Sequence, residues 1–438
     1  MTREALYICA RCDSQYQKWQ GQCDECNAWG TIAQQSDNSE AGAHIETIPA
    51  TDVSLAAVGR FPVGMREIDS VLGGGLVEGS LTLLAGEPGI GKSTLVLHIA
   101  QGMLRAGGSV LYVCGEESPQ QISERLDRLN VDKTKLLFLP RAGVVSIMSA
   151  IKKEKPSLLI VDSVQTAYHE QQEGEPGSIV QVRSVTGTLL QLAKETGVPV
   201  VLIGHVTKEG TVAGPRLLEH MVDVVLSLEG DRFHEHRLLR SVKNRFGPTN
   251  YVGVFSMASE GLSEVENPSA LFLDAHTSSP GSVVSAIMEG NRPFLVEIQA
   301  LTQKTSFGYP KRTVSGFDAN RLEVLLAVLS KRAGLKLDDQ DVFINMVGGL
   351  KSKDPALDLA VSLAVVSSLT SQTLPEQMLV LGEVGLGGEV RNVSYVEQRI
   401  AEASRLGFTS FMAPKSSHQQ SIVVHTIREA LSAIQITV

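Results

Sequence analysis

The chain has 438 residues and a formal net charge of -9, with 43% hydrophobic and 20% charged residues. Two or three domains are expected, because this length exceeds what one ordinary core supports. The acidic balance argues against a uniformly basic nucleic-acid coat protein, although it leaves room for a local basic channel. The sequence has no apolar run of membrane-spanning length and no signal-peptide pattern, so we expect a cytoplasmic protein.

Four of the five cysteines lie near the N-terminus, in two C-x-x-C pairs: Cys9, Cys12, Cys23 and Cys26. Four thiolates at this spacing can close a tetrahedral zinc sphere, and a closed sphere indicates a structural ion. About thirty residues cannot bury enough core to fold alone, so the metal would supply the missing stability. Redox chemistry at either pair is the alternative. We expect a C4 zinc finger over residues 1–30 and a polar linker over residues 31–58.

From about Gly59, short apolar strands alternate with helices. Strands are expected at Ser80–Ala85, Val110–Cys114, Leu158–Asp162 and Val198–Gly204. Continuous apolar strands between helices predict an α/β domain with a mostly parallel sheet. Two later strands, near His236–Val242 and Tyr251–Met257, are typical of a hairpin. We place the α/β domain at residues 59–266 and a separate α+β domain at residues 267–438.

A phosphate-binding loop follows the first strand and opens a helix over Lys92–Arg105. The loop residues are Gly86, Glu87, Pro88, Gly89, Ile90, Gly91, Lys92 and Ser93. Its glycines let backbone amides curl round phosphates, and the helix N-terminus adds positive potential. We expect Lys92 to hold the β- and γ-phosphates of ATP and Ser93 to ligate Mg²⁺. Thr94 is expected to touch phosphate through its amide or hydroxyl.

Polar side chains at the ends of the other strands predict ATP hydrolysis. Asp162 ends a buried strand, where it would orient the magnesium shell, although a capping aspartate is the alternative. Glu116 and Glu117 follow another strand, and one of them, with Glu116 favoured, would orient or deprotonate the attacking water. His205 ends a further strand, where a polar group can sense the γ-phosphate; a structural histidine is the alternative.

Lys243-Asn244-Arg245-Phe246-Gly247 lies between the two strands of the expected hairpin, at the edge of the sheet. In ring ATPases such a turn can reach the nucleotide of the neighbouring subunit. Cations delivered in this way neutralise charge that builds up on the γ-phosphate. We therefore expect Lys243 and Arg245 to act across a subunit interface, with a solvated basic turn as the alternative.

The cysteine module, the phosphate-binding loop and the Lys-Asn-Arg-Phe-Gly motif, in this order, closely resemble the RadA (Sms) family of bacterial DNA repair proteins. The resemblance covers essentially the whole chain, and the five-residue motif is specific to it. It implies a RecA-like core, a hexameric ring, RecA as a partner, and ATP-dependent handling of single-stranded and branched DNA. Candidate DNA contacts are two loops, at residues 166–180 with Tyr168 and at residues 207–218 with Lys208 and Arg216.

Residues from about Pro268 resemble the proteolytic domain of Lon, which has a ribosomal S5 domain 2-like fold. Lys353-Asp354-Pro355-Ala356 matches the segment of the Lon nucleophilic serine, and Gly382–Val390 matches the segment before its catalytic lysine. Here the two positions hold Ala356 and Glu397. A methyl group cannot attack a peptide bond, so we expect a catalytically inactive scaffold.

The leading hypothesis is a DNA-dependent ATPase motor of recombination and repair. The alternatives are a non-motor ATP switch that regulates a recombinase, and an ATP-dependent peptidase.

Overall fold

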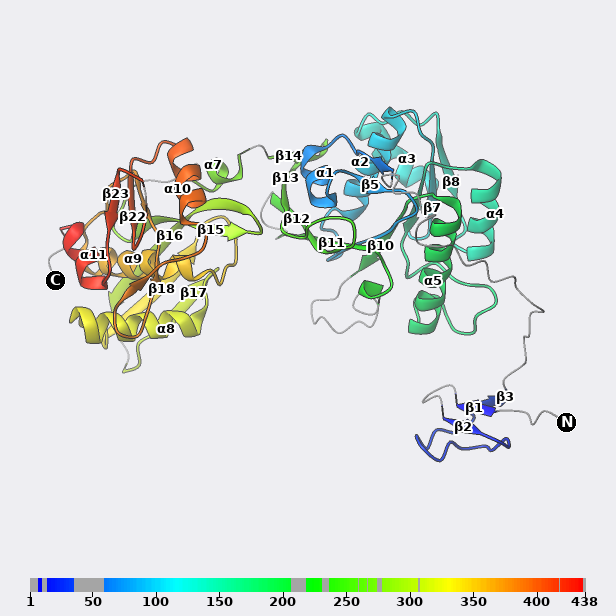
Figure 1. Cartoon of the computed structure of the whole chain (residues 1–438), viewed down its shortest axis with the longest axis horizontal. Helices are drawn as coiled ribbons and strands as arrows, with labels where there is room; N and C mark the ends of the chain where they lie inside the picture. The colour runs from blue at the N-terminus through cyan, green and yellow to red at the C-terminus, as the bar shows by residue number, and fades with distance from the viewer. Residues whose placement is uncertain are drawn as a thin grey trace, which may run out of the picture. The chain divides into compact units, whose positions relative to one another are not determined.

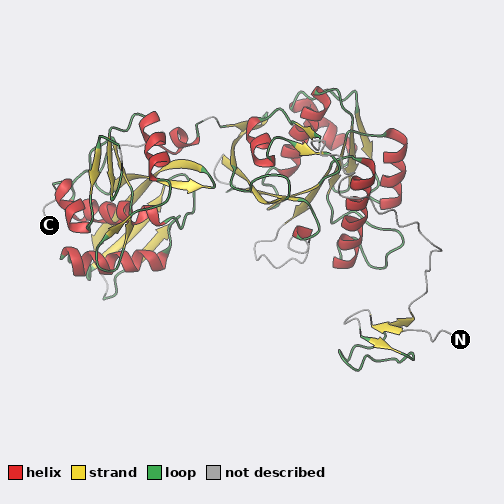
Figure 2. Cartoon of the chain, in the orientation of Figure 1, coloured by secondary structure: helices red, strands yellow, loops and turns green. Residues whose placement is uncertain are grey.

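The computed structural model describes residues 7–9, 14–34, 59–205, 218–230, 236–258, 260–265, 267–273, 278–305, 308–416 and 418–435. The chain divides into two compact units, Met1–Ala57 and Val58–Val438. Figure 1 follows each unit along the chain, and Figure 2 separates its helices from its strands. Within the described ranges, no helix combines the length and the apolar character that crossing a membrane requires.

The first unit is a small antiparallel sheet of three strands. β1 (Tyr7–Cys9) pairs with both β2 (Gln15–Tyr16) and β3 (Ile32–Gln34). β3 lies in the stretch where the composition suggested a linker. Trp19 and Trp29, the only tryptophans in the sequence, are 62% and 73% exposed.

The second unit begins with a nine-stranded sheet in the order β14-β13-β12-β11-β6-β10-β9-β7-β8. Its parallel strands are β6 (Leu81–Gly86), β7 (Val110–Cys114), β8 (Leu136–Leu139), β9 (Leu158–Asp162), β10 (Val200–His205) and β11 (Val224–Glu229). Its antiparallel strands are β12 (His236–Asn244), β13 (Val252–Ala258) and β14 (Gly261–Glu264). The mostly parallel sheet predicted from the alternation is confirmed. A short separate pair joins β4 (Arg60–Phe61) to β5 (Leu76–Val77).

Helices cover both faces of this sheet. They are α1 (Arg66–Leu72), α2 (Lys92–Arg105), α3 (Pro119–Arg128), α4 (Val144–Glu154) and α5 (Ile179–Thr196). Neighbouring residues of β6 belong to different cores: Leu84 packs in the cluster under α2, and Leu83 packs in the cluster under α5. The strands are continuous apolar runs because helices bury both sides of each strand.

The hairpin β12–β13 is confirmed, but one expectation about it is wrong. β12 is flanked by β11 and β13, so Lys243 does not lie on an edge strand. The motif instead occupies the end of an interior strand and the turn that follows it.

The C-terminal part of this unit is built on a seven-stranded sheet in the order β17-β18-β16-β15-β19-β22-β23. The strands are β15 (Ser282–Glu289), β16 (Arg292–Lys304), β17 (Arg312–Ser315), β18 (Gln340–Met346), β19 (Met378–Val380), β22 (Ser410–Ala413) and β23 (Ser421–Val423). β20 (Glu383–Val384) and β21 (Val390–Arg391) form a small hairpin.

The helices of this part are α7 (Pro268–Leu273), α8 (Ala319–Val328), α9 (Asp358–Thr370), α10 (Val396–Arg405) and α11 (Ile427–Ala433). A π-helical turn, Leu329–Ala333, continues α8, and a 3₁₀ turn, Pro355–Leu357, precedes α9. The α9 helix is apolar nearly all round, because it is buried in the centre of this part.

Candidate functional site

The phosphate-binding loop closes around the ε-amino group of Lys92. Gly86 ends β6, and Gly91 caps α2 with a φ of 112°, a left-handed conformation that glycine adopts without strain. Lys92 Nζ donates to the carbonyl oxygens of Gly86 and Glu87, each at 2.9 Å. Burial lowers the pKa of Lys92, and two nearby carboxylates raise it. The loop is therefore a backbone cradle with a cation at its floor, a shape that suits a polyphosphate.

The tip of the loop is open and its base is anchored. Pro88 and Gly89 are exposed, whereas Ile90 is buried. Arg237 of β12, which is itself buried, donates from Nε to the carbonyl oxygen of Ile90 at 3.0 Å. No sequence pattern signals Arg237, because its contact depends on β12 crossing close to the loop.

Four neighbouring parallel strands bring the other candidate residues to this loop. The register sets His205 beside Gly86, and Cys114 beside Asp162. β10 lies between the loop strand β6 and the strand β9 that ends in Asp162. Because the carboxyl ends of parallel strands share one edge, residues from β6, β7, β9 and β10 converge there.

Asp162 is almost fully buried at this edge. Tyr112 donates from its hydroxyl to Asp162 Oδ2 at 2.6 Å. Burial raises the pKa of Asp162, while hydrogen bonds from Tyr112 and Ser93 lower it. A carboxylate beside a hydroxyl offers the oxygen ligands that Mg²⁺ prefers, so Ser93 and Asp162 fit a magnesium site.

Glu116 and Glu117 occupy different surroundings. Glu116 Oε1 lies 2.8 Å from His205 Nε2 and also accepts a hydrogen bond from Ser163 Oγ. Glu117 Oε1 instead accepts from the guanidinium of Arg125 at 2.7 Å. The structure therefore separates two acids that the sequence left as alternatives, and Glu116 is the one that joins the ends of β9 and β10.

Lys243 lies toward the other end of the sheet. It pairs with Val225, which in turn pairs with Leu83, three residues before Gly86. At a rise of about 3.3 Å per residue, this is about 10 Å along β6 from the phosphate-binding loop, and β12 is two strands away from β6. Lys243 is thus remote from the loop of its own chain.

The two cations of the motif are held at this far end. Lys243 Nζ donates to the carbonyl oxygens of Glu219 and Val222, at 2.7 and 2.8 Å. The pKa of Lys243 is lowered, chiefly by desolvation and to a smaller extent by repulsion from Arg245. Arg245 is half-exposed, and its Nη1 lies 3.4 Å from Oδ1 of the buried Asp223. The motif is therefore anchored to the chain that precedes β11.

Of the two loops proposed to contact DNA, the structure describes the first in full and only the end of the second. Residues 207–217 lie outside the described residues. In the first loop, Glu170 accepts a hydrogen bond from the backbone of Val145 at 3.1 Å, and Gln181 Nε2 donates to the carbonyl oxygen of Gln172 at 2.6 Å. The loop at residues 166–180 is thus tied to α4 and α5.

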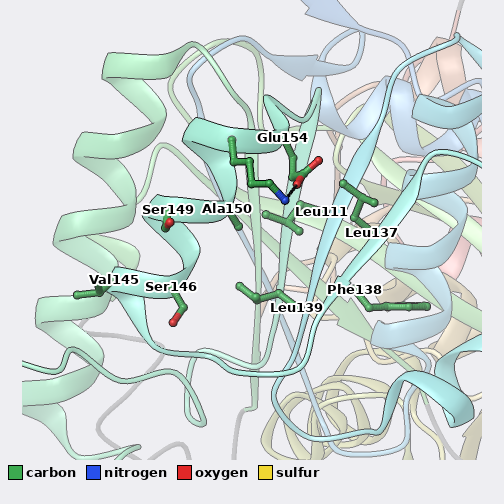
Figure 3. Close-up of a pocket in the computed structure, with 10 residues that line it drawn as sticks. Leu111, Leu137, Phe138, Leu139, Val145, Ser146, Ser149, Ala150 and Glu154 are labelled. Carbon is green, nitrogen blue, oxygen red and sulfur yellow. Dashed lines mark ion pairs between the residues drawn. The ribbon is translucent and has the colours of Figure 1, made fainter.

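A cavity of about 570 Å³ lies between β8 and α4 (Figure 3). Leu137 and Phe138 come from the strand, and Val145 and Ser149 come from the helix. This cavity is lined by none of the candidate ATP-site residues, so it is a separate feature of the sheet's end.

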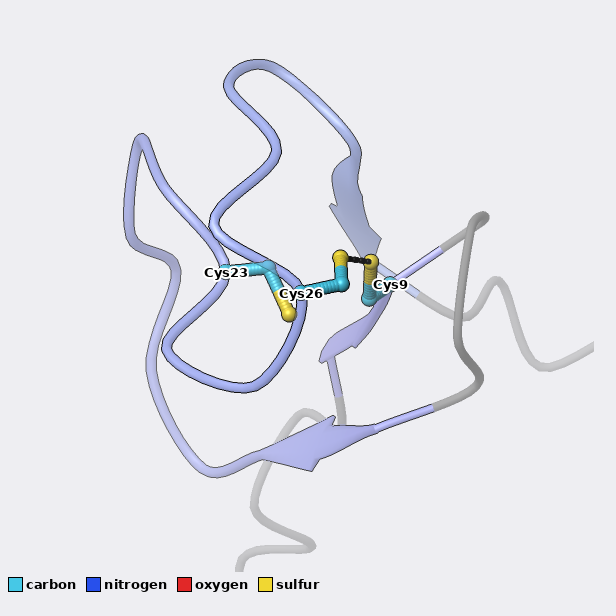
Figure 4. Close-up of side chains that lie close together, drawn as sticks. All are labelled: Cys9, Cys23 and Cys26. Carbon is cyan, nitrogen blue, oxygen red and sulfur yellow. Dashed lines mark hydrogen bonds between the residues drawn. The ribbon is translucent and has the colours of Figure 1, made fainter.

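Three of the four metal-ligand candidates form a cluster in the first unit. The sulfurs of Cys9, Cys23 and Cys26 lie within 4.8 Å of one another, and those of Cys9 and Cys26 are 3.7 Å apart (Figure 4). Thiolates around zinc, with bonds of about 2.3 Å, sit about 3.8 Å apart. Disulfide sulfurs would be about 2.0 Å apart. The cluster fits a zinc ion; Cys12 lies outside the described residues.

The two Lon-like positions differ in burial, and neither carries the side chain that Lon uses. Ala356 is fully buried in an apolar cluster with Val396 and Ile400. Glu397 is exposed on α10. Two residues further along the helix, the buried Arg399 donates to Asp354 Oδ2 at 2.7 Å. A methyl group and an ion pair thus occupy the region where Lon carries its serine and lysine.

Comparison with protein-family models agrees with this architecture. Family models match for a rubredoxin metal binding domain at residues 7–34, an AAA domain at residues 50–211, and the subunit ChlI of Mg-chelatase at residues 303–417. A solved ATPase domain covers 48% of this chain and 92% of its own at 16% identity, with a TM-score of 0.43.

The fold and the site define a RecA-like P-loop ATPase with an N-terminal zinc ribbon and a C-terminal Lon-like domain. DNA repair protein RadA of Bacillus subtilis is 45% identical over 426 residues, covering 94% of this chain and 93% of that protein. The Pseudomonas aeruginosa protein of the same name is 45% identical over 448 residues and covers 98% of both. The Aquifex aeolicus protein is 44% identical over 417 residues and covers 94% of both. The chain therefore belongs to the family of the DNA repair protein RadA.

Proposed function

We propose that this protein is a DNA-dependent ATPase motor that moves branched recombination intermediates together with RecA. In this proposal it works as a hexameric ring in which each ATP site is completed by the neighbouring subunit. The observation that carries the proposal is that, within one chain, Lys243 lies far from the phosphate-binding loop. Lys92, Asp162 and Glu116 converge on the phosphate-binding loop, whereas Lys243 is anchored at the far end of the sheet.

Each chain supplies most of one site. The loop amides and Lys92 hold the phosphates, and Ser93 and Asp162 hold Mg²⁺. Glu116 orients the attacking water, and His205, hydrogen-bonded to the same carboxylate, links its position to the γ-phosphate. The ion supplies Lewis acidity when bound.

The neighbouring chain supplies the remaining charge. Lys243 and Arg245 sit at the end of an interior strand, so they can project at a subunit surface. As charge builds up on the γ-phosphate, two cations held there neutralise it. A ring of such interfaces makes hydrolysis depend on the position of the neighbour, which is what a motor needs.

The proposed DNA substrate and the proposed RecA partner are supported by the similarity to known proteins. The relatives that cover nearly the whole chain are named DNA repair proteins, and the motif order resembles the RadA family. Nothing in the acidic net charge of -9 opposes this, because binding depends on local cations.

A mixing experiment tests the shared site. We expect Lys92→Ala and Lys243→Ala each to abolish most DNA-stimulated ATP hydrolysis and branch migration on a three-stranded DNA substrate. A mixture of the two variants should recover part of both activities, because some interfaces pair an intact loop with an intact Lys243. Lys152→Ala, which alters an exposed lysine of α4, is the matched control. Wild-type branch migration by Lys243→Ala, or no recovery in the mixture, contradicts the proposal.

A non-motor ATP switch that acts on RecA is the second candidate, favoured by the same complete hydrolytic set. A strand-displacement assay distinguishes the motor from the switch. A motor displaces a strand from three-stranded DNA with ATP alone, whereas a switch does so only when RecA is present.

A further inference from the structure

The hairpin β12–β13 is shared between two hydrophobic cores. Leu239 and Phe255 pack in the core of the nine-stranded sheet. Val254, with Leu238 packed beside it, belongs to the core of the C-terminal sheet. Successive residues of a strand point to opposite faces, so the hairpin is buried on one side by each domain. Its turn carries the second half of the Lys243–Gly247 motif.

The tip of a second hairpin, β15–β16, closes on that turn. Asn291 donates from its backbone nitrogen to the carbonyl oxygen of Asn250 at 2.7 Å. A Cβ atom on Gly290 would clash with the same oxygen, and Gly290 has a φ of 65°. Glycine allows this approach without strain. Asn250 belongs to the turn that begins with Arg245.

Two ion pairs hold the same tip, one to α1 and one to β12. Arg292 Nη1 lies 2.9 Å from Oε2 of Glu67, a buried carboxylate of α1 that also accepts from the backbone of Val254 at 3.1 Å. Arg240 of β12 pairs with Glu289, the last residue of β15. A buried carboxylate does not readily stay without its cation, so Arg292 holds the tip tightly in place.

We infer that Gly290 and Arg292 are positioning residues for Lys243 and Arg245. The tip of β15–β16 sets where the motif turn stands, and the C-terminal domain thereby controls how far the two cations reach toward the neighbour's nucleotide. This inference rests on the proposed shared ATP site. It gives the Lon-like domain a role in the ATPase cycle itself, in addition to serving as a scaffold.

The test uses the full-length chain with Arg292→Ala. We expect kcat for DNA-stimulated ATP hydrolysis to fall about tenfold while KM for ATP changes less than about twofold, because the chain's own phosphate-binding loop is untouched. Arg292→Lys, which keeps the charge, should recover most of kcat. Arg391→Ala, which removes the exposed pair with Glu389 in the same domain, is the control and should behave as wild type.

Mixing two variants distinguishes a misplaced motif turn from a general loss of folding or activity. Subunits with Arg292→Ala keep an intact loop, so mixing them with Lys92→Ala subunits, which keep an intact tip, should recover activity. Gly290→Ala repeats the test without removing a charge, and it replaces Arg292→Ala if that variant does not fold.

The outcomes test the positioning role separately from the shared ATP site. Wild-type kcat in both tip variants overturns the positioning role. Recovery in the Lys243→Ala mixture, without recovery in either tip mixture, also overturns it and leaves the shared site standing. Failure of the Lys243→Ala mixture removes the shared site and the positioning role together.

Discussion

Glu116 and His205 share a hydrogen bond of 2.8 Å between Oε1 and Nε2, although they follow β7 and end β10, two strands that β9 keeps apart. Ser163, which follows β9, donates to the same oxygen. One carboxylate oxygen thus joins the ends of three adjacent strands. Its position is set by the order of the strands in the sheet and by the side chains on either side of it.

Glu116→Gln should bind ATP normally and hydrolyse it about 10² to 10⁴ times more slowly, because an amide cannot accept the proton of the attacking water. Glu117→Gln is the matched control. It weakens only the partly exposed pair with Arg125, so its rate should stay near that of the wild type. Single-turnover hydrolysis with a separate nucleotide-binding assay measures both. Slow hydrolysis by the Glu117 variant and normal hydrolysis by the Glu116 variant would exchange their roles.

Tyr112→Phe should shift the acid limb of ATP hydrolysis to higher pH. Burial already raises the pKa of Asp162, and the hydrogen bond from Tyr112 lowers it, so removing the hydroxyl raises this pKa further. As pH falls through that pKa, the carboxylate takes up a proton and loses its capacity to hold Mg²⁺. The pH profile of kcat/KM is the readout, and Tyr309→Phe, at a highly exposed tyrosine, is the control. Superimposable profiles would remove Tyr112 from this role.

Removing zinc should unfold the first unit without affecting the second. Structural zinc contributes on the order of 10 kcal/mol to the folding of so small a module, and the two units are compact separately. Trp19 and Trp29 are the only tryptophans, so tryptophan anisotropy reports on this module alone. We expect a strong chelator, or Cys23→Ser, to lower the anisotropy while the thermal transition of residues 58–438 stays in place. Added zinc should reverse the chelator's effect; purified wild-type protein without zinc would contradict the assignment.

Arg321→Ala should destabilise the C-terminal part by about 3 kcal/mol, because it strands the carboxylate of Asp358, which is 1% exposed. Burial raises the pKa of Asp358 and the Arg321 hydrogen bond lowers it. The folded-state pKa of Asp358 is already raised with Arg321 present, and losing Arg321 raises it further, so the deficit is largest at neutral pH and shrinks as pH falls toward that pKa. Denaturant unfolding at two pH values measures this. Arg391→Ala, at an exposed pair, should leave the stability near that of the wild type.

Several site residues can be predicted from the sequence because a local pattern marks each of them. The phosphate-binding loop is a spacing pattern between a strand and a helix, and Asp162 and His205 each end an apolar run. These features need no knowledge of which strand lies beside which. Glu116 and Glu117 remain alternatives in the sequence, with Glu116 favoured, and the contacts of Glu116 with His205 and Ser163 depend on the order of the strands.

The rest depends on neighbours that are distant in sequence. Tyr112 reaches Asp162 only because β7 pairs with β9, and Arg237 reaches Ile90 only because β12 lies near the loop. β8 escapes prediction, since a four-residue strand is too short to stand out from its surroundings. The buried pair of Arg399 with Asp354 likewise joins residues that no spacing pattern connects.

The end of the nine-stranded sheet at β8 has a consequence for handling the protein. β8 is paired on one side, with β7; its own Leu137 and the nearby Val145 of α4 are exposed. An unpaired strand with apolar neighbours is a template for edge-to-edge aggregation. β8 is only four residues long and is preceded by the exposed Lys135, which limits such pairing by shortness and by charge. Refolding yield should therefore fall with rising salt, which screens that lysine.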